Sequence, residues 1–126
     1  MKLRMKENSL RLRISRSELA RFAAEHRIEE TVHLTPEPNG KLTYVLESGS
    51  GAATSVRYAA QEITVVITEE QARTWSEEDQ VGIYTTIDIG PAGMLEVIVE
   101  KDFACLDRSD EDNEDTFANP HVGSVC

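Results

Sequence analysis

Basic side chains recur at alternate positions near the N-terminus, and their spacing suggests a binding surface. Side chains two positions apart share one face of a strand, so this pattern predicts a basic strand face. Such a face can bind the phosphates of a nucleic acid or the carboxylates of a protein. The basic residues of this row are Lys2, Arg4, Lys6, Arg11, Arg13 and Arg16. Of these, Arg4, Lys6, Arg11 and Arg13 are the candidate partner-binding residues.

A second interpretation of the same row needs no partner. The basic side chains then form a solvated strand face that pairs with the acidic C-terminal tail or with Glu residues on the next strand. The formal net charge of −10 and the lack of interleaved aromatic residues disfavour binding to a nucleic acid.

Cys105, His121 and Cys126 have the side-chain types that zinc prefers. Their spacings are long, and the sequence contains no Cys-x-x-Cys or His-x-x-x-His pair, so a small buried cysteine without metal is the alternative. Residues 110–114 alternate carboxylates as a calcium loop does, but they lack the glycine and the final glutamate of that motif. We therefore expect no metal and no cofactor.

His26 and His33 are candidate general bases, because imidazole titrates near neutral pH. No nucleophile or acid partner stands at a recognisable spacing from either histidine. Residues 48–51 (Ser-Gly-Ser-Gly) are glycine-rich, but no Lys-Ser/Thr follows them as in a phosphate-binding loop. The sequence predicts no catalytic residue and a protein that is not an enzyme.

The elements that must position the basic row occur twice in the chain. Residues 55–101 align with residues 2–48 at a fixed offset of 53 positions with no gap. Seven of the 47 aligned positions are identical, against roughly three expected by chance at ordinary composition. Matched positions include Arg4/Arg57, Ser15/Thr68, Phe22/Trp75, Ile28/Val81, Leu34/Ile87, Pro38/Pro91 and Gly40/Gly93. We therefore predict a duplication.

Each copy predicts a β-α-β-β unit preceded by a short strand. The alternation of apolar residues slips by one position within residues 5–10 and again within residues 58–63, which requires a bulge or a tight turn. Ser15 with Glu18, and Thr68 with Gln71, have the spacing of a capping box at a helix start.

One stripe of the first helix is predicted to face inward, formed by Leu19, Phe22, Ala23 and His26. In the second helix, Ala72 and Trp75 form a narrower stripe.

These patterns predict an α+β fold in a single domain of residues 1–126. The two units are expected to form a pseudo-twofold, barrel-like or strongly curved antiparallel sheet of six to eight strands with two short helices. Antiparallel pairing is expected because the tight Pro-x-Gly turns leave no room for crossovers. The parts are repeat one (2–48), a linker (49–54), repeat two (55–101) and an acidic tail (102–126). Residues 107–115 are expected to be a loop, with Phe117 holding the end against the body.

No stretch approaches the roughly 18 apolar residues that a membrane span needs. The basic N-terminus is not followed by the apolar segment of a secretory signal, and two cysteines fit a reducing compartment. We expect a cytoplasmic protein that does not bind membranes.

The order strand, Ser/Thr cap, short helix, strand, turn, strand is similar to the swapped-hairpin domains of SpoVT/AbrB type. Residues 63–67 and 95–100 carry this resemblance, and two such units in one chain resemble the tandem MraZ regulators, which implies DNA binding. Thr68 replaces the family's proline, and Asp79-Gln80 replaces its Gly-Asp. Residues 2–13 and 100–106 also resemble an uncharacterised family of small bacterial proteins.

Three functions remain open from the sequence. The first is a non-enzymatic protein-interaction or regulatory module of a bacterial cytoplasm, which uses the basic face and the acidic tail against an unidentified protein. The second is a nucleic-acid-binding regulator of the tandem swapped-hairpin kind. The third is a metal-binding protein that uses Cys105 and His121. The sequence does not indicate an oligomeric state.

Overall fold

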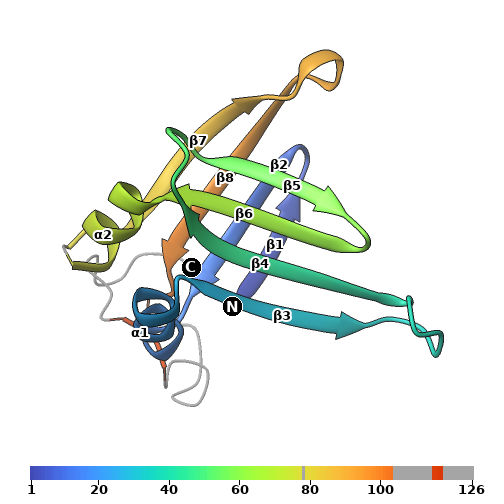
Figure 1. Cartoon of the computed structure of the whole chain (residues 1–126), viewed down its shortest axis with the longest axis horizontal. Helices are drawn as coiled ribbons and strands as arrows, with labels where there is room; N and C mark the ends of the chain where they lie inside the picture. Colours follow the sequence, from blue (N-terminus) through green and yellow to red (C-terminus); the bar gives the residue numbers. More distant parts are fainter. Residues whose placement is uncertain (78, 104–114, 118–126) are drawn as a thin grey trace.

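The chain forms strands and helices in an order that runs twice (Figure 1). The computed structural model describes residues 1–77, 79–103 and 115–117. The first half contains β1 (Lys2–Lys6), β2 (Ser9–Ile14), α1 (Arg16–Glu25), β3 (Arg27–His33) and β4 (Lys41–Gly49). The second half contains β5 (Ser55–Ala59), β6 (Glu62–Thr68), α2 (Glu69–Glu77), β7 (Gly82–Asp88), the 3-10 helix η1 (Gly90–Ala92) and β8 (Met94–Lys101). The α+β class and the two short helices are confirmed.

The predicted slips in alternation are two-residue hairpin turns. Lys6 pairs with Ser9 across the β1–β2 turn, and Ala59 pairs with Glu62 across the β5–β6 turn. Between Ala59 and Glu62, Ala60 has φ 52° and Gln61 has φ 61°. Positive φ at both central residues is the backbone of a type I′ turn, which matches the twist of the flanking strands. Each turn returns the chain directly, so both copies begin with a tight hairpin.

Both predicted capping boxes are present. The Ser15 side chain accepts from the Glu18 N–H, and the Glu18 carboxylate accepts from the Ser15 N–H at 3.0 Å. Thr68 and Gln71 exchange the same two bonds, at 3.0 and 2.8 Å. These bonds satisfy N–H groups that a helix start leaves without partners, so they fix where each helix begins.

The strands form two four-stranded sheets, each of which combines one hairpin from each half (Figure 1). The first sheet has the order β1-β2-β8-β7, and the second has the order β3-β4-β6-β5. The central pair of each sheet is parallel: β2 with β8, and β4 with β6. Ser9 pairs with Glu96 and Glu62 pairs with Thr43, so both central pairs have the same register under the offset of 53.

The predicted barrel-like antiparallel sheet is therefore wrong. Neither sheet closes, because β1 and β7 remain edges of the first sheet, and β3 and β5 remain edges of the second. Tight turns do enforce antiparallel pairing within each hairpin. The paired central strands, however, come from different hairpins, so the length of a hairpin turn does not constrain their direction.

The gapless alignment is also wrong for one strand. Ile28 lies opposite Leu46, and Ile83 lies opposite Val99, which is the equivalent of Leu46. The structural equivalent of Ile28 is therefore Ile83, at an offset of 55, and not Val81. The second copy has two more residues before its third strand and two fewer in the following hairpin turn. For that reason Gly93 has φ 101° in its turn, whereas Gly40 does not have a positive φ.

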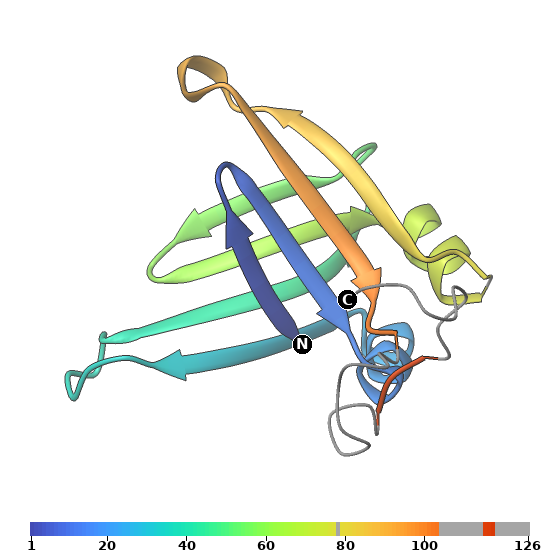
Figure 2. The same ribbon diagram turned by 180° about the vertical axis from the view of Figure 1, so that it is seen from behind.

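The core lies between the two sheets, which cross each other, and under the two helices at one end (Figure 2). The rings of Phe22 and Trp75 meet edge to face, with centroids 6.3 Å apart. Both side chains are almost completely buried. Ala23 and His26, predicted to face inward, are exposed. α1 ends at Glu25, and the cap residue His26, with a φ of 64°, turns the chain into β3. Among the described residues, the largest fully buried side chains are Leu12, Ile14, Phe22, Val45, Leu46, Val65, Ile67, Trp75, Val97 and Val99.

We expect the Trp75→Ala substitution to lower the free energy of unfolding by about 3–5 kcal/mol, because it empties the largest side-chain volume in the core. The matched control is Tyr58→Ala, which removes an aromatic side chain that is 71% exposed and should change stability by about 0.5 kcal/mol or less. Urea unfolding of both variants tests the difference. Similar losses for the two would contradict the placement of Trp75.

We expect the double substitution Ala60→Asn, Gln61→Gly to raise stability by about 1 kcal/mol. The left-handed conformation costs an ordinary L-residue roughly 1–2 kcal/mol, and Asn-Gly adopts it readily. Thermal unfolding measures the change. A fall in stability would mean that these two residues do not occupy a type I′ turn.

Candidate functional site

Five of the six basic residues identified from the sequence lie together on the outer face of the first sheet, and the sixth, Arg16, begins α1. We call Lys2, Arg4, Lys6, Arg11 and Arg13 the basic strip. Lys2 lies opposite Arg13 and Arg4 lies opposite Arg11, so like charges face each other across the β1–β2 pair. The neighbouring strands β8 and β7 contribute Glu100, Ile98 and Tyr84 to the same face.

Part of the basic strip is neutralised within the chain. One carboxylate, Glu100, lies 3.1 Å from Nε of Arg13 and 3.5 Å from Nε of Arg11. Tyr84 donates its hydroxyl to the other oxygen of Glu100 at 3.3 Å, and the Glu100 charge and burial together raise the pKa of Tyr84, with burial the larger cause. The predicted pairing with a Glu on the next strand is confirmed for these two arginines.

The remaining end of the basic strip has no such compensation. Within the described residues, Arg4 and Lys6 take part in no ion pair. They border a small cleft of about 190 Å³ together with Ser9, Arg11 and Ile98. The structure therefore presents two unpaired cations beside a half-buried apolar side chain.

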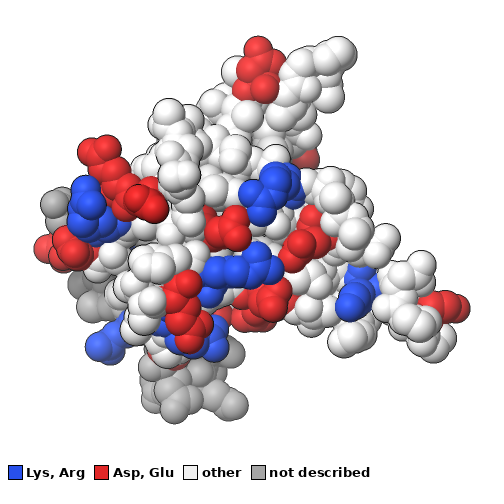
Figure 3. All heavy atoms as spheres, in the orientation of Figure 1, with Lys and Arg blue, Asp and Glu red and all other residues white. Residues whose placement is uncertain are grey.

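The outer face of the second sheet is the internal comparison, because it is built from equivalent strands. There Arg27 contacts Glu29, Glu47 and Glu62 at 3.1–3.3 Å, and Arg57 contacts Glu47 at 3.1 Å. Figure 3 shows acidic and basic side chains interleaved over this face. Arg57 is the repeat equivalent of Arg4 and has a carboxylate partner, whereas Arg4 has none among the described residues.

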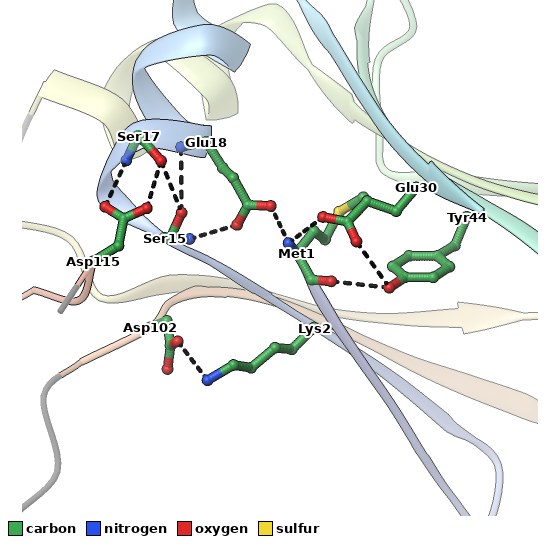
Figure 4. Close-up of polar contacts among 9 residues, drawn as sticks. All are labelled: Met1, Lys2, Ser15, Ser17, Glu18, Glu30, Tyr44, Asp102 and Asp115. Carbon is green, nitrogen blue, oxygen red and sulfur yellow. Dashed lines mark hydrogen bonds and ion pairs between the residues drawn. The ribbon is translucent and has the colours of Figure 1, made fainter. Parts of the chain in front are cut away.

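A larger polar cleft of about 750 Å³ lies at one end of the basic strip, where Met1, α1 and the C-terminal segment meet (Figure 4). The Met1 amino group donates to Glu18 and, at 2.6 Å, to Glu30. Tyr44 donates its hydroxyl to the Met1 carbonyl at 3.0 Å. The residues that line this cleft are Met1, Lys2, Arg13, Ser15, Ser17, Glu18, Arg21, Glu30, Asp102, Asp115 and Thr116.

The protonation states of the groups in this cleft are better suited to binding a charged group than to transferring a proton. Burial raises the pKa of Glu18, but hydrogen bonds from the Met1 ammonium and the Ser15 N–H lower it further, so the net pKa lies below its usual value. Burial and the charge of Glu30 raise the pKa of Tyr44. At neutral pH Glu18 is therefore an ionised acceptor and Tyr44 a protonated donor, and each already has a partner.

The described part of the C-terminal segment docks at the same cleft. Asp115 accepts from the N–H of Ser17 at 3.1 Å and from its hydroxyl, at the start of α1 (Figure 4). Asp102 accepts from Nζ of Lys2 at 2.9 Å. Phe117 contacts Phe103 edge to face and donates its N–H to the Asp102 carbonyl at 2.8 Å. The prediction that Phe117 holds this end against the body is confirmed.

The other sequence-predicted sites separate into two groups. Cys105, His121, Cys126, the carboxylates of residues 110–114 and most of the predicted loop at 107–115 lie outside the described residues. His26 and His33 are exposed at the ends of α1 and β3. Within the described residues, no group of three or more His, Cys, Asp or Glu side chains could hold a metal ion. In the same residues, no helix is long and apolar enough to cross a membrane.

The pairing of the basic row with the acidic tail or with a Glu on the next strand was predicted, but the sequence did not identify Asp102 and Glu100 as the carboxylates that form it. Glu18 was recognised as a capping residue, but its contact with Met1, and the part of Glu30 and Tyr44 in the cleft, carried no local signal.

The chain belongs to a family of unknown function, DUF7009, whose family model matches residues 1–121. No curated protein matches the chain, and no solved structure matches it. Membership of this family assigns no activity, so the function is not readable from the comparison.

We expect the Asp115→Asn substitution to reduce the acid sensitivity of the fold. The hydroxyl of Ser17 lowers the pKa of Asp115, with further contributions from Ser15, the Ser17 N–H and the charge of Arg16. A lowered pKa stabilises the folded state above the ordinary value of about 3.9, and this contribution is lost as the pH falls below it. Urea unfolding between pH 6 and pH 3 should therefore show a shallower loss for the variant. An unchanged slope would contradict the docked position of Asp115.

Proposed function

We propose that the basic strip binds an acidic segment of a protein partner, and that the chain acts as a non-enzymatic interaction module. The observation that supports this proposal is the occupancy of the strip by carboxylates of its own chain. Glu100 forms ion pairs with Arg11 and Arg13, and Asp102 forms one with Lys2. A carboxylate from a partner would meet the same chemistry at Arg4 and Lys6, which have no such contact among the described residues.

The energetic cost of the strip supports the same proposal. Like charges directly opposite each other destabilise a strand pair, and Arg4 lies opposite Arg11. The equivalent position in the second sheet avoids this cost, because Arg57 lies opposite Thr64 and pairs with Glu47. A local cost that one copy avoids and the other keeps is the pattern expected at a binding site.

Charge and surface character favour a protein partner over a nucleic acid. A net charge of −10 repels an extended phosphate backbone, whereas a short acidic segment need contact only the strip. Tyr84 and Ile98 on the same face add aromatic and apolar area beside the cations. A bound peptide with an apolar side chain next to its carboxylates would use both.

The test compares Arg4→Glu with Arg57→Glu, two reversals of charge at equivalent positions. Binding of a fluorescein-labelled decapeptide of Glu, Asp and Leu is measured by fluorescence anisotropy at low salt. We expect Arg4→Glu to weaken binding about tenfold or more, since the loss of one contact of about 1.4 kcal/mol has that effect. Arg57→Glu should leave the affinity within about twofold.

Stability provides the second measurement for the same pair of variants. Arg4→Glu should raise the free energy of unfolding by about 0.2–1 kcal/mol, because Glu then lies opposite Arg11. Arg57→Glu loses a surface ion pair and should lower it by up to about 1 kcal/mol. Equal loss of binding in both variants, or no loss in either, would refute the proposed site.

The tandem swapped-hairpin resemblance makes nucleic acid the other outcome to examine. A single-stranded or duplex oligonucleotide replaces the peptide in the same assay. If the strip neutralised four phosphates, the logarithm of affinity would fall with the logarithm of salt concentration at a slope near −3.6, from about −0.9 for each contact. Oligonucleotide binding with that slope, and no peptide binding, would replace the proposed function with the nucleic-acid alternative.

A further inference from the structure

The edge strands of the two sheets differ in how they are protected from pairing with another chain. An edge strand exposes unpaired backbone N–H and C=O groups, and charged side chains are the usual protection. β1 carries three basic residues, β3 begins Arg-Ile-Glu-Glu, and β5 has a central arginine. By contrast, β7 has the sequence Gly-Ile-Tyr-Thr-Thr-Ile-Asp, with its one charge at the last position.

The direction of the free backbone groups of β7 follows from the bonds at its two ends. Lys101 donates its N–H to the Val81 carbonyl at 3.0 Å, and Ile89 donates to the Gly93 carbonyl at 2.9 Å. Alternate residues of an antiparallel pair bond the partner strand, so the odd-numbered residues of β7 face β8. The even-numbered residues therefore direct their N–H and C=O groups to the open edge. Gln80 caps the Gly82 carbonyl at 3.0 Å, which leaves Tyr84 and Thr86 at the centre of that edge.

We infer that β7 pairs antiparallel with β7 of a second copy of the chain, about a two-fold axis at Thr85. In this register Tyr84 lies opposite Thr86 of the second copy, and these residues exchange the backbone bonds that the described part of each copy leaves open. Gly82 lies opposite Asp88 of the second copy, so no like charges meet. Ile83 lies opposite Ile87 of the second copy on the inner face.

The same register brings exposed apolar side chains together. Val81 and Ile89 flank β7, and both are more than a third exposed in the single chain. In the proposed pairing, Val81 of each copy lies opposite Ile89 of the other. Cross-strand apolar pairs of this kind stabilise an antiparallel strand pair.

The other three edges do not allow an equivalent self-pairing. Antiparallel pairing of β1 with itself about its centre places Arg4 opposite Arg4, and that of β5 places Arg57 opposite Arg57. Pairing of β3 about its centre places Glu30 opposite Glu30. Like charges that face each other across a strand pair oppose association, so β7 is the edge that favours a second copy.

The β7 pairing would also affect partner binding. This effect rests on the proposed function, whereas the pairing itself does not. A two-fold axis perpendicular to the sheet joins two first sheets into one continuous sheet with both basic strips on the same face. The two β2 strands then lie five strand spacings apart, or about 24 Å. A partner with two acidic segments could bind both strips at once, which raises its apparent affinity.

The test is the oligomeric state of the full chain, measured by sedimentation velocity over a range of concentrations. We expect a monomer–dimer equilibrium for the unmodified protein. Thr86→Pro removes an N–H from the open edge without breaking a bond to β8, and it should weaken the dimer at least tenfold. Thr31→Pro is the matched control, because Thr31 is the structural equivalent on β3 and should leave the equilibrium unchanged.

A second measurement covers the case in which the proline variant fails to fold. With Cys105 and Cys126 replaced by serine, Thr85→Cys should form a disulfide-linked dimer on mild oxidation, because the two copies of residue 85 lie directly opposite each other. Tyr58→Cys in the same background, at an exposed position of β5, should not. The inference would be overturned if the unmodified protein stays monomeric at high concentration. It would also be overturned if the Thr86→Pro variant dimerises as strongly as the unmodified protein. Neither result would bear on binding of the acidic peptide, which Arg4→Glu tests separately.

Discussion

The structure depends on two parallel strand pairs that join the halves of the chain. β2 pairs with β8 in the first sheet, and β4 pairs with β6 in the second, with the same register. Each pair combines one strand from each half of the chain, so neither half completes a sheet with its own strands. The inner faces of both sheets then share one core with Phe22 and Trp75. Because each half contributes one hairpin to each sheet, the fold is one cooperative unit and not two linked ones.

The same pairing creates two equivalent outer faces and allows them to diverge. On the second sheet, Arg27 and Arg57 are surrounded by carboxylates, and the charges compensate each other. On the first sheet, the parallel pair brings Glu100 beside Arg11 and Arg13 but leaves Arg4 and Lys6 without an ion pair among the described residues. The second sheet therefore serves as an internal comparison for the first. The unbalanced charge on the first sheet marks the surface that we propose to bind a partner.

Local features of this fold could be predicted from the sequence, and long-range ones could not. The caps at Ser15 and Thr68 depend on residues within three positions of each other, and both were predicted correctly. The two tight hairpins are equally local, and the sequence limited them to a bulge or a tight turn. The partner of each central strand depends on residues about 20 to 90 positions away, and no spacing within the chain reveals it. Antiparallel closure was inferred from turn length, which governs hairpins but says nothing about strands that pair across the two halves.

The candidate site shows the same division. Alternation alone placed Arg4, Lys6, Arg11 and Arg13 on one face, and the register confirms that arrangement. The shared contact of Arg11 and Arg13 with Glu100 could not be predicted, because it requires the β2–β8 pairing. The two-residue shift of β7 was also invisible to a gapless alignment, since Val81 and Ile83 are both apolar and either could match Ile28.

Native-state hydrogen exchange tests the joining of the halves most directly. If the central pairs hold both halves in one unit, the amides of β2, β4, β6 and β8 should exchange with one common free energy, equal to that of global unfolding. Residues of the first half that exchange at a clearly lower free energy than those of the second would contradict the account, because they would show that the halves open independently.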